Sequence, residues 1–482
     1  MKLRLSSRQS VLAKIQAYQV GMTLQKHQSG LEVEYRFRES LGDQNQSDPL
    51  WKMPEKGVFT EDFHQDLVSG ETDLVVHSWK DLPVEEKAET CIAATLPRAD
   101  QRDLLLFKKS SMGQAQVRIY SSSPRRAQNL EGFLAWALPW KNEKIEFATV
   151  RGNVPTRVKK MLEDPNVDAL ILAKAALDRL LTDTQFPETI EFLRQAMESC
   201  QWMVLPLSEN PNAAAQGALA IEASRKNSSL LKLFSEINCS DSFQAAQRER
   251  EILQEFGGGC HLALGMSVLH RPYGRLEIVK GRTPKGSVLH EKRFYPRKVL
   301  PAAVSPARLR FSSERAALSN LPTVSADALF IAKTEAWVPS SAANWVWAAG
   351  LQTWKKLAQK GVWVHGSAEG LGEKEDPRIE ILAGQKMKWT TLTHEGASSE
   401  SNSNSIATYR LALRLETREL GPETCFQWKS SSEFLLAAKT FPQLKERLHI
   451  CGPGKTYEKI FQVLGSDQNI FVELSDEFIT VI

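Results

Sequence analysis

The chain has 482 residues, of which 42% are hydrophobic and 24% are charged. This length exceeds what one hydrophobic core supports, so we expect two to four domains, and the composition is that of a globular protein. A net charge of +4 is too small to indicate a nucleic-acid partner, and no basic run forms a polybasic tail.

The amino terminus and the cysteines exclude two further classes. MKLRLSSRQSVLAKIQ lacks the apolar segment of a signal peptide, and no stretch approaches roughly 18 apolar residues, so we expect a cytoplasmic protein without membrane spans. The six cysteines are dispersed and form no CxxC pair, which predicts neither a disulfide framework nor a metal site.

In residues 1–200, short apolar runs alternate with amphipathic helical stretches. KLRLSS reads as a strand followed by the helix VLAKIQAYQVGMTLQKH, and LEVEYRFR alternates with a period of two. TDLVVHS and VDALILA are short buried runs. This order predicts an α/β fold with largely parallel sheets, in which ligands gather beyond the carboxyl ends of the strands.

Hydroxyl and charged residues recur at four of these predicted strand ends. They are Ser6 to Arg8; Ser78, Lys80 and Asp81; Ser121 to Arg126; and Arg151 to Arg157. Arginine binds carboxylates through paired, charge-assisted hydrogen bonds, and serine hydroxyls add neutral donors. The repetition therefore predicts a convergent anion-binding cleft, against the alternative of scattered surface charges.

Beyond residue 225 the pattern changes. DSFQAAQREREILQEF predicts a charged amphipathic helix that runs directly into GGGC at 257–260, and LALGMSVLH and RLEIVKGR read as strands of a small α+β unit. A further region begins near 301 and contains EGASSESNSNS, a low-complexity stretch typical of a flexible loop.

These stretches together carry a family resemblance. Residues 1–300 resemble hydroxymethylbilane synthase, also called porphobilinogen deaminase, in eight stretches that occur in the family's order. They are SSRQSVLA (6–13), KGVF (56–59), VVHSWKDLP (75–83), SSSPRR (121–126), RGNVPTR (151–157), DALILAKAALDRL (168–180), QGALAIE (216–222) and GGC (258–260).

The resemblance implies a fold and a division into domains. We expect an α/β protein with two lobes like those of periplasmic binding proteins, a small α+β domain and a carboxyl-terminal α/β region. Domain 1 would hold 1–95 and 200–225, domain 2 would hold 96–199, and domain 3 would hold 226–300. A region of 301–482 would follow.

The resemblance also implies an activity and a cofactor. The family joins four porphobilinogen molecules head to tail with loss of ammonia and releases hydroxymethylbilane. Its primer is a dipyrromethane bound to a cysteine through a thioether, and the matching residue is Cys260. Flanking glycines give that loop room beside a bulky ligand, and a thiolate is a good nucleophile toward an electrophilic methylene.

Asp81 matches the catalytic aspartate of the family. A fixed carboxylate beside the pyrrole nitrogen would stabilise the positive charge that develops as ammonia leaves. Other motif positions match the family's cofactor and substrate contacts. The cofactor contacts are Lys80, Ser122, Arg125 and Arg126, and the substrate contacts are Arg8, Ser10, Lys56, Phe59, Ser78, Ser123, Arg151 and Arg157.

Four residues depart from the family's pattern. Tyr120, Pro155 and Ala215 stand where the family has glycine, and Gly257 stands where it has glutamate. Because glycine permits close approach or a positive φ, these changes are expected to reshape loops that bind carboxylates.

The tail at 301–482 resembles uroporphyrinogen-III synthase in 347–372 and in 426–465. That family needs no cofactor and acts mainly by holding its substrate in a folded conformation. Candidate contacts are Ser430, Ser431, Ser432, Gly452 and Thr456. The open alternative is a structural extension.

We therefore expect a monomeric enzyme whose partner is the small molecule porphobilinogen, with no nucleic acid, membrane or metal. The rival from another class is a two-lobed anion-binding protein without catalysis. Such a protein would need neither Cys260 nor domain 3.

Overall fold

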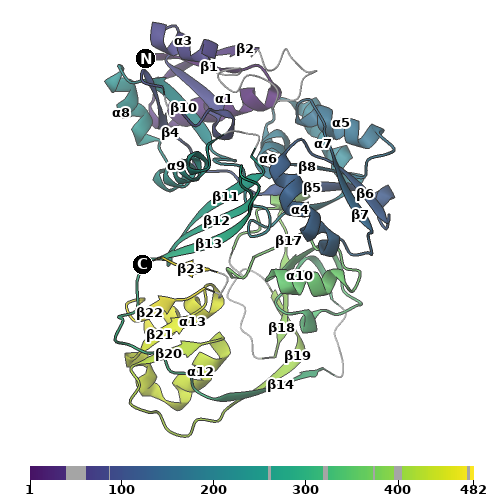
Figure 1. Cartoon of the computed structure of the whole chain (residues 1–482), viewed down its shortest axis with the longest axis vertical. Helices are drawn as coiled ribbons and strands as arrows, with labels where there is room; N and C mark the ends of the chain where they lie inside the picture. Colours follow the sequence, from purple (N-terminus) through teal and green to yellow (C-terminus); the bar gives the residue numbers. More distant parts are fainter. Residues whose placement is uncertain are drawn as a thin grey trace. The chain divides into compact units, whose positions relative to one another are not determined.

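The protein is described by a computed structural model of the full chain (Figure 1). The described residues are 1–39, 61–85, 87–258, 262–318, 324–372, 375–395, 404–474 and 478–481. The chain divides into two compact units. The first unit is Met1–Ala135, Asn142–Leu269 and Ile278–His290; the second is Trp136–Lys141, His270–Glu277 and Glu291–Ile482.

The first unit begins with a mixed five-stranded sheet in the order β2-β1-β3-β10-β4. β1 pairs in parallel with β2 and β3, whereas β10 runs antiparallel to β3 and β4. The strands are β1 (Lys2–Arg8), β2 (Glu32–Arg38), β3 (Leu74–Ser78), β4 (Thr90–Ala94) and β10 (Leu219–Ser224). The helices of this part are α1 (Val11–His27), α3 (Glu61–Ser69) and α8 (Ser228–Glu236).

A second mixed five-stranded sheet has the order β7-β6-β8-β5-β9. β6 pairs in parallel with β7 and β8, and β5 runs antiparallel to β8 and β9. The strands are β5 (Asp103–Lys108), β6 (Gln116–Tyr120), β7 (Lys144–Ala148), β8 (Ala169–Ala173) and β9 (Cys200–Val204). The helices are α4 (Pro124–Ala137), α5 (Val154–Glu163), α6 (Lys174–Thr182) and α7 (Pro187–Glu198).

The chain therefore passes from the first sheet to the second and back again. The return comes later than expected from the sequence, because 200–204 forms β9 and completes the second sheet beside β5. The crossing back is made at β10. The helix α8 also belongs with the first sheet, since Leu230, Leu233 and Phe234 pack into its core.

The small α+β part contains α9 (Ser240–Glu255) and a sheet in the order β11-β12-β13-β23. Its strands are β11 (Leu264–Arg271), β12 (Gly274–Arg282), β13 (Val288–Pro296) and β23 (Ile479–Thr480). The last strand comes from the far end of the chain and pairs in parallel with β13, at Arg293↔Ile479 and Phe294↔Thr480.

The tail in the second unit contains two further sheets, each accompanied by helices (Figure 1). The six-stranded sheet β14-β19-β18-β15-β16-β17 is parallel except for the antiparallel pair β14 and β19. Its strands are β14 (Phe311–Ala317), β15 (Ser325–Ile331), β16 (Ala342–Ala348), β17 (Gly366–Ser367), β18 (Trp389–His394) and β19 (Asn404–Leu415), with helices α10 (Leu351–Ala358) and α11 (Glu380–Ala383).

The other sheet of the tail is the parallel set β20-β21-β22. Its strands are β20 (Cys425–Trp428), β21 (Leu448–Cys451) and β22 (Ile470–Val472), with helices α12 (Ser431–Thr440) and α13 (Lys455–Leu464). The α/β class predicted from the sequence is confirmed for both units.

Local sequence explains where the helices near the strand ends begin and stop. Ser10 caps α1, because its hydroxyl accepts a hydrogen bond from the backbone N–H of Ala13. Asn153 caps α5 in the same way, with Pro155 in the first turn, where no helical N–H is needed. The helix α9 stops at Gly257, whose φ of 92° ends it in the left-handed region.

Candidate active site

The predicted site residues follow the carboxyl ends of four strands in the first unit. Arg8 ends β1, and Ser78 ends β3. Ser122 and Ser123 follow β6 and lead into α4, whose first turn carries Arg125 and Arg126. Arg151 follows β7 and precedes α5, which carries Arg157. The local order predicted from the sequence therefore holds at all four positions.

Asp81 stands at the end of a short 3-10 turn, Trp79–Asp81, directly after β3. Trp79 fixes this turn: it is buried, its ring lies 5.2 Å from that of Phe243, and its backbone N–H donates to the carbonyl of Ala218. The carboxylate of Asp81 is exposed and has no hydrogen-bond partner among the residues that the structure describes. It is therefore available to a ligand.

Lys80 lies beside Asp81 and is half-buried. Its Nζ donates to Oε1 of Gln216 at 3.2 Å. Burial lowers the pKa of Lys80, the charge of Asp81 opposes this, and the charge of Arg126 adds to it. The positive charges of Lys80, which follows a strand of the first sheet, and Arg126, which follows a strand of the second, thus repel one another.

The pKa of Arg157, on α5, is also affected by neighbouring positive charges. Its Nε donates to the carbonyl of Gly152 at 2.6 Å. Burial lowers the pKa of Arg157 to about 10, helped by the charges of Arg126 and Arg151, while Asp81 opposes the shift. We call Lys80, Arg125, Arg126, Arg151 and Arg157 the cationic cluster. An anion bound within it would relieve this repulsion.

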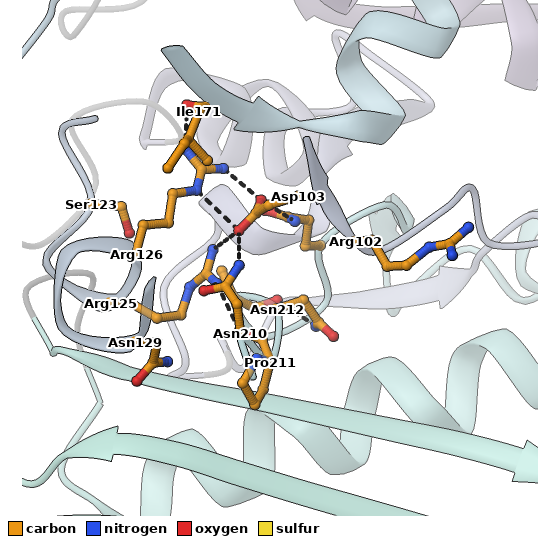
Figure 2. Close-up of polar contacts among 12 residues, drawn as sticks. Arg102, Asp103, Ser123, Arg125, Arg126, Asn129, Ile171, Asn210, Pro211 and Asn212 are labelled. Carbon is orange, nitrogen blue, oxygen red and sulfur yellow. Dashed lines mark hydrogen bonds and ion pairs between the residues drawn. The ribbon is translucent and has the colours of Figure 1, made fainter. Parts of the chain in front are cut away.

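Arg125 and Arg126 are more buried than a direct ligand contact would suggest, and both bind the carboxylate of Asp103 (Figure 2). Asp103 opens the apolar strand β5 and is fully buried. Burial by itself would raise the pKa of Asp103, but the two guanidinium charges hold this pKa well below its usual range.

The serines mainly order their own turns. Ser122 Oγ donates to the carbonyl of Val150 and accepts from the same residue's N–H, which ties the end of β6 to the end of β7. Ser78 Oγ hydrogen-bonds with the side-chain amide of Gln16 on α1. With Ser10 in its capping role, these hydroxyls hold the strand ends in place.

Three predicted site residues lie outside the described part of the chain. They are Lys56, Phe59 and Cys260. The described chain stops at Gly258, just after α9, and begins again at Leu262, just before β11.

Sequence reasoning missed the acceptors and amides behind the cationic cluster. Asp103, Asn210 and Gln216 join residues far apart in the chain, at sequence separations of up to 136. The one local signal was an acid at the start of the apolar run DLLLF. Glu249 of α9 was missed as well, and its carboxylate binds Arg98 through two hydrogen bonds of 2.9 and 2.7 Å.

The departures from the family's glycines are accommodated locally. Tyr120 Oη donates to Asp164 at 2.6 Å, and Pro155 occupies the first turn of α5. Ala215 keeps a left-handed backbone with φ 60°, and its N–H donates to Glu249 at 2.8 Å. Gly257 has φ 92°, a conformation that a glutamate would adopt only with strain.

The second unit has a cavity of about 790 Å³ at the carboxyl ends of its three-stranded sheet. Trp428 and Lys429 at the end of β20 and Gly452 after β21 line it. Of the predicted tail contacts, Gly452 alone lines this cavity. Ser430 instead caps α12, accepting a hydrogen bond from the N–H of Glu433.

No group of three or more His, Cys, Asp or Glu side chains within the described ranges is placed to hold a metal ion. No helix in those ranges has the length and apolar character needed to cross a membrane.

The first unit is thus an α/β protein with two mixed sheets and a cationic cluster around one exposed carboxylate. Comparison with known proteins identifies the family. A family model described as "Porphobilinogen deaminase, dipyromethane cofactor binding domain" matches residues 3–232. The porphobilinogen deaminase of Syntrophomonas wolfei is 37% identical over 280 residues, which cover 57% of this chain and 83% of that protein. The enzyme of Lawsonia intracellularis is 32% identical over 266 residues, covering 55% and 78%.

The chain belongs to the porphobilinogen deaminase family. It carries that family's dipyrromethane cofactor binding domain and has porphobilinogen deaminase activity in tetrapyrrole biosynthesis. Among solved structures, YhfZ of Shigella flexneri (TM-score 0.26, 12% identity, 52% of this chain, 91% of that chain) and the methionine-binding protein MetQ (0.28, 11%, 52%, 95%) are similar.

Proposed function

We propose that the first unit, with Cys260, joins four porphobilinogen molecules into hydroxymethylbilane, and that Asp81 is the catalytic carboxylate. The observation that carries this assignment is the position of Asp81: exposed, on a turn anchored by Trp79, and within the influence of Lys80 and Arg157. A carboxylate fixed at this position can stabilise positive charge on a pyrrole nitrogen as ammonia leaves.

The cationic cluster fits the dipyrromethane in its donor chemistry. Each pyrrole carries an acetate and a propionate, and burying such anions requires cations that hydrogen-bond to them. Arg126, Arg151 and Arg157 supply more positive charge than Asp81 and Asp103 cancel. When bound, the dipyrromethane supplies the primer to which rings are added, and Lys80, Ser122, Arg125, Arg126 and Cys260 would hold it.

The remaining assignments concern the incoming substrate. Arg8, Arg151 and Arg157 would bind its carboxylates, with Ser10, Ser78 and Ser123 ordering the strand ends around them. Lys56 and Phe59 would cover the substrate. We retain the predicted division into four domains with two changes: the strand β9 moves to the second domain, and the helix α8 moves to the first.

Intact mass tests this assignment directly. The purified full chain should weigh two pyrrole units more than its sequence and should redden with an acidic aldehyde reagent. Cys260→Ala should remove both signals, whereas Cys239→Ala, a change at another thiol of the same region, should keep them. A wild-type mass equal to the bare chain would overturn the assignment of Cys260 as the residue that carries the dipyrromethane.

For the tail we propose cyclisation of hydroxymethylbilane to uroporphyrinogen III. The supporting observation is the cavity beyond the carboxyl ends of β20, β21 and β22, where ligands of parallel sheets bind. A tethered second site would also capture the bilane before it closes on its own to isomer I.

Filling that cavity tests the proposal within the full chain. A Cβ added at Gly452 would meet nothing within 4 Å, so Gly452→Phe should fit without backbone strain. Fed with porphobilinogen, the wild type should give mainly isomer III, and the variant should give isomer I at an unchanged rate of substrate consumption. Gly132→Phe, at an equally open and exposed glycine of α4, is the matched control. Isomer I from the wild type would make the tail a structural extension.

A further inference from the structure

The carboxylate of Asp103 receives an unusual number of hydrogen bonds for one buried side chain (Figure 2). Oδ1 accepts from Arg126 Nη2 at 2.7 Å and from Gln216 Nε2 at 2.9 Å. Oδ2 accepts from Arg125 Nη2 at 2.8 Å, Arg126 Nε at 3.0 Å and Asn210 Nδ2 at 2.8 Å. Both oxygens are thus fully engaged, which fixes the carboxylate in one orientation.

The two guanidinium groups are fixed equally well. Arg126 binds Asp103 in a bidentate manner and donates from Nη1 to the carbonyl of Ile171 on β8. Arg125 donates from Nη1 to Asn210 Oδ1 at 2.9 Å and to the carbonyl of Pro211 at 2.7 Å. Since a guanidinium is planar, contacts on two of its sides determine which way its remaining N–H groups point.

Asp103 also reaches the turn that carries Asp81. Gln216 donates from Nε2 to Asp103, and its Oε1 accepts from Lys80 Nζ at 3.2 Å. The same amide donates to the carbonyl of Gln101 at 2.8 Å. One hydrogen-bonded path therefore runs from Arg126 through Asp103 and Gln216 to Lys80, the neighbour of Asp81.

The charge balance suits an anion site. Two guanidinium groups around one carboxylate keep one net positive charge, whereas Arg125 and Arg126 alone would repel each other in a buried place. Both arginines lie in the first turn of α4, where the helix dipole disfavours cations. The negative charge of Asp103 offsets this unfavourable effect. Without a negatively charged partner, the two guanidinium groups would be forced apart or into solvent.

The geometry points to Asp103 as a positioning residue for porphobilinogen polymerisation, which holds Arg125, Arg126 and, through Gln216, Lys80 in one fixed arrangement for pyrrole carboxylates. This inference rests on the proposed role of the arginines as carboxylate contacts. Asp103 itself touches no reacting atom in it. Its removal should therefore act on the binding of cofactor and substrate beyond any loss of stability.

Asp100 provides a matched control for the experiment. It is a second buried aspartate close to Asp103 in the sequence. Its Oδ2 lies 2.6 Å from Arg102 Nη2 and 3.4 Å from Lys174 Nζ. Neither residue belongs to the cationic cluster. Asp100→Asn and Asp103→Asn should both lower the melting temperature of the full chain, because each breaks a buried ion pair.

The two variants should differ in ligand binding. Asp103→Asn should be purified with less than about a tenth of its chains carrying the dipyrromethane mass, or should raise the KM for porphobilinogen at least about tenfold. Asp100→Asn should keep the cofactor and stay within about threefold of the wild-type KM. Equal behaviour of the two in cofactor content and KM would overturn the inference.

Arg126→Ala separates this inference from the proposed function on which it rests. Loss of cofactor or a raised KM in Arg126→Ala, together with normal binding in Asp103→Asn, refutes the role of Asp103 alone. Normal binding in Arg126→Ala refutes the carboxylate-binding role of the arginines.

If Asp103→Asn does not fold, Asp103→Glu carries the test. It keeps the charge but adds a methylene, which shifts both guanidinium groups, so it should retain the cofactor and raise KM more than it lowers kcat. A wild-type KM in Asp103→Glu would show that the position of the arginines is unimportant.

Discussion

The cationic cluster of the first unit and the cavity of the second differ in the balance of charge among the residues that form them. In the cluster, Arg125, Arg126, Arg151, Arg157 and Lys80 face two carboxylates, Asp81 and Asp103, and burial lowers the pKa of Arg157 to about 10. The charged residues that line the cavity nearly balance. They are Lys298, Arg308, Lys429, Glu369 and Glu473.

The walls of the cavity also carry aromatic side chains, those of Trp428, Phe471 and Phe478. Two of its cations already have protein partners: Lys298 pairs with Asp467 at 2.9 Å, and Arg308 donates to Gln427 at 2.7 Å. The comparison teaches that a surplus of cations distinguishes the first region, whereas the charges that line the second nearly cancel.

The largest effect should come from the single exposed carboxylate of the charged site. Asp81→Asn keeps the shape of the side chain but removes the charge, so turnover should fall at least about a hundredfold, as when a charge-stabilising group is lost. Steady-state assays and intact mass measure this, with cofactor content unchanged. Asp62→Asn, an exposed acid on α3, is the control. Near-normal turnover of Asp81→Asn would sink the catalytic assignment.

The next largest effect concerns the arginines that should bind substrate carboxylates. Arg151→Ala should raise the KM for porphobilinogen roughly tenfold or more, because a desolvated carboxylate loses its charged donor. Lys159→Ala removes an exposed cation of α5 that only pairs with Glu163 at 3.8 Å, so KM should hardly change. Equal, small effects on KM would return the arginines to ordinary surface charges and erase the contrast between the two sites.

The second unit should be the more sensitive to acid because it buries two neutral histidines. Burial lowers the pKa of His365 to about 3 and that of His449 to about 4, and Nδ1 of each accepts a hydrogen bond, from Val346 N–H and Trp428 Nε1–H. Below about pH 6.5 these histidines bind protons in the unfolded chain, where their pKa is about 6.5, but not in the folded chain. The stabilisation is therefore complete above about pH 6.5 and declines toward pH 4, by about 1.4 kcal/mol per unit for each histidine.

Calorimetry of the full chain between pH 7.5 and 5 measures this decline. His449→Gln, which stays neutral, should flatten the pH dependence of the transition that belongs to the second unit. An unchanged slope in this variant would remove His449 from the explanation.

The smallest effect is expected at Ala215. Glycine would relieve the left-handed backbone of this residue, but it would lose a buried methyl group and gain freedom in the unfolded chain. These terms offset one another, so Ala215→Gly should change the free energy of unfolding by less than about 1 kcal/mol and leave KM unchanged. Chemical denaturation measures the first quantity. A large rise in stability would mean that the alanine strains the first unit.

Much of the site followed from local sequence. Strand-forming runs that end in hydroxyl or charged residues predicted where Ser78, Lys80, Arg126 and Arg151 would stand, because the side chain at a strand end is set by a few neighbouring residues. The order of short apolar runs and helices likewise predicted the α/β class. Both depend on periodicities that lie within about ten residues of chain.

The tertiary structure alone decided which groups meet. Asp103 is 22 residues from Arg125 and 113 residues from Gln216, and nothing local marks an acid at the start of an apolar strand as the partner of two arginines. The strand β9 joins the second sheet, and β23 joins β13, because the pairing of edge strands depends on which edge the folded chain leaves open. Local patterns thus determined the kinds of residues at the site, whereas long-range packing determined their partners, their burial and hence their charge states.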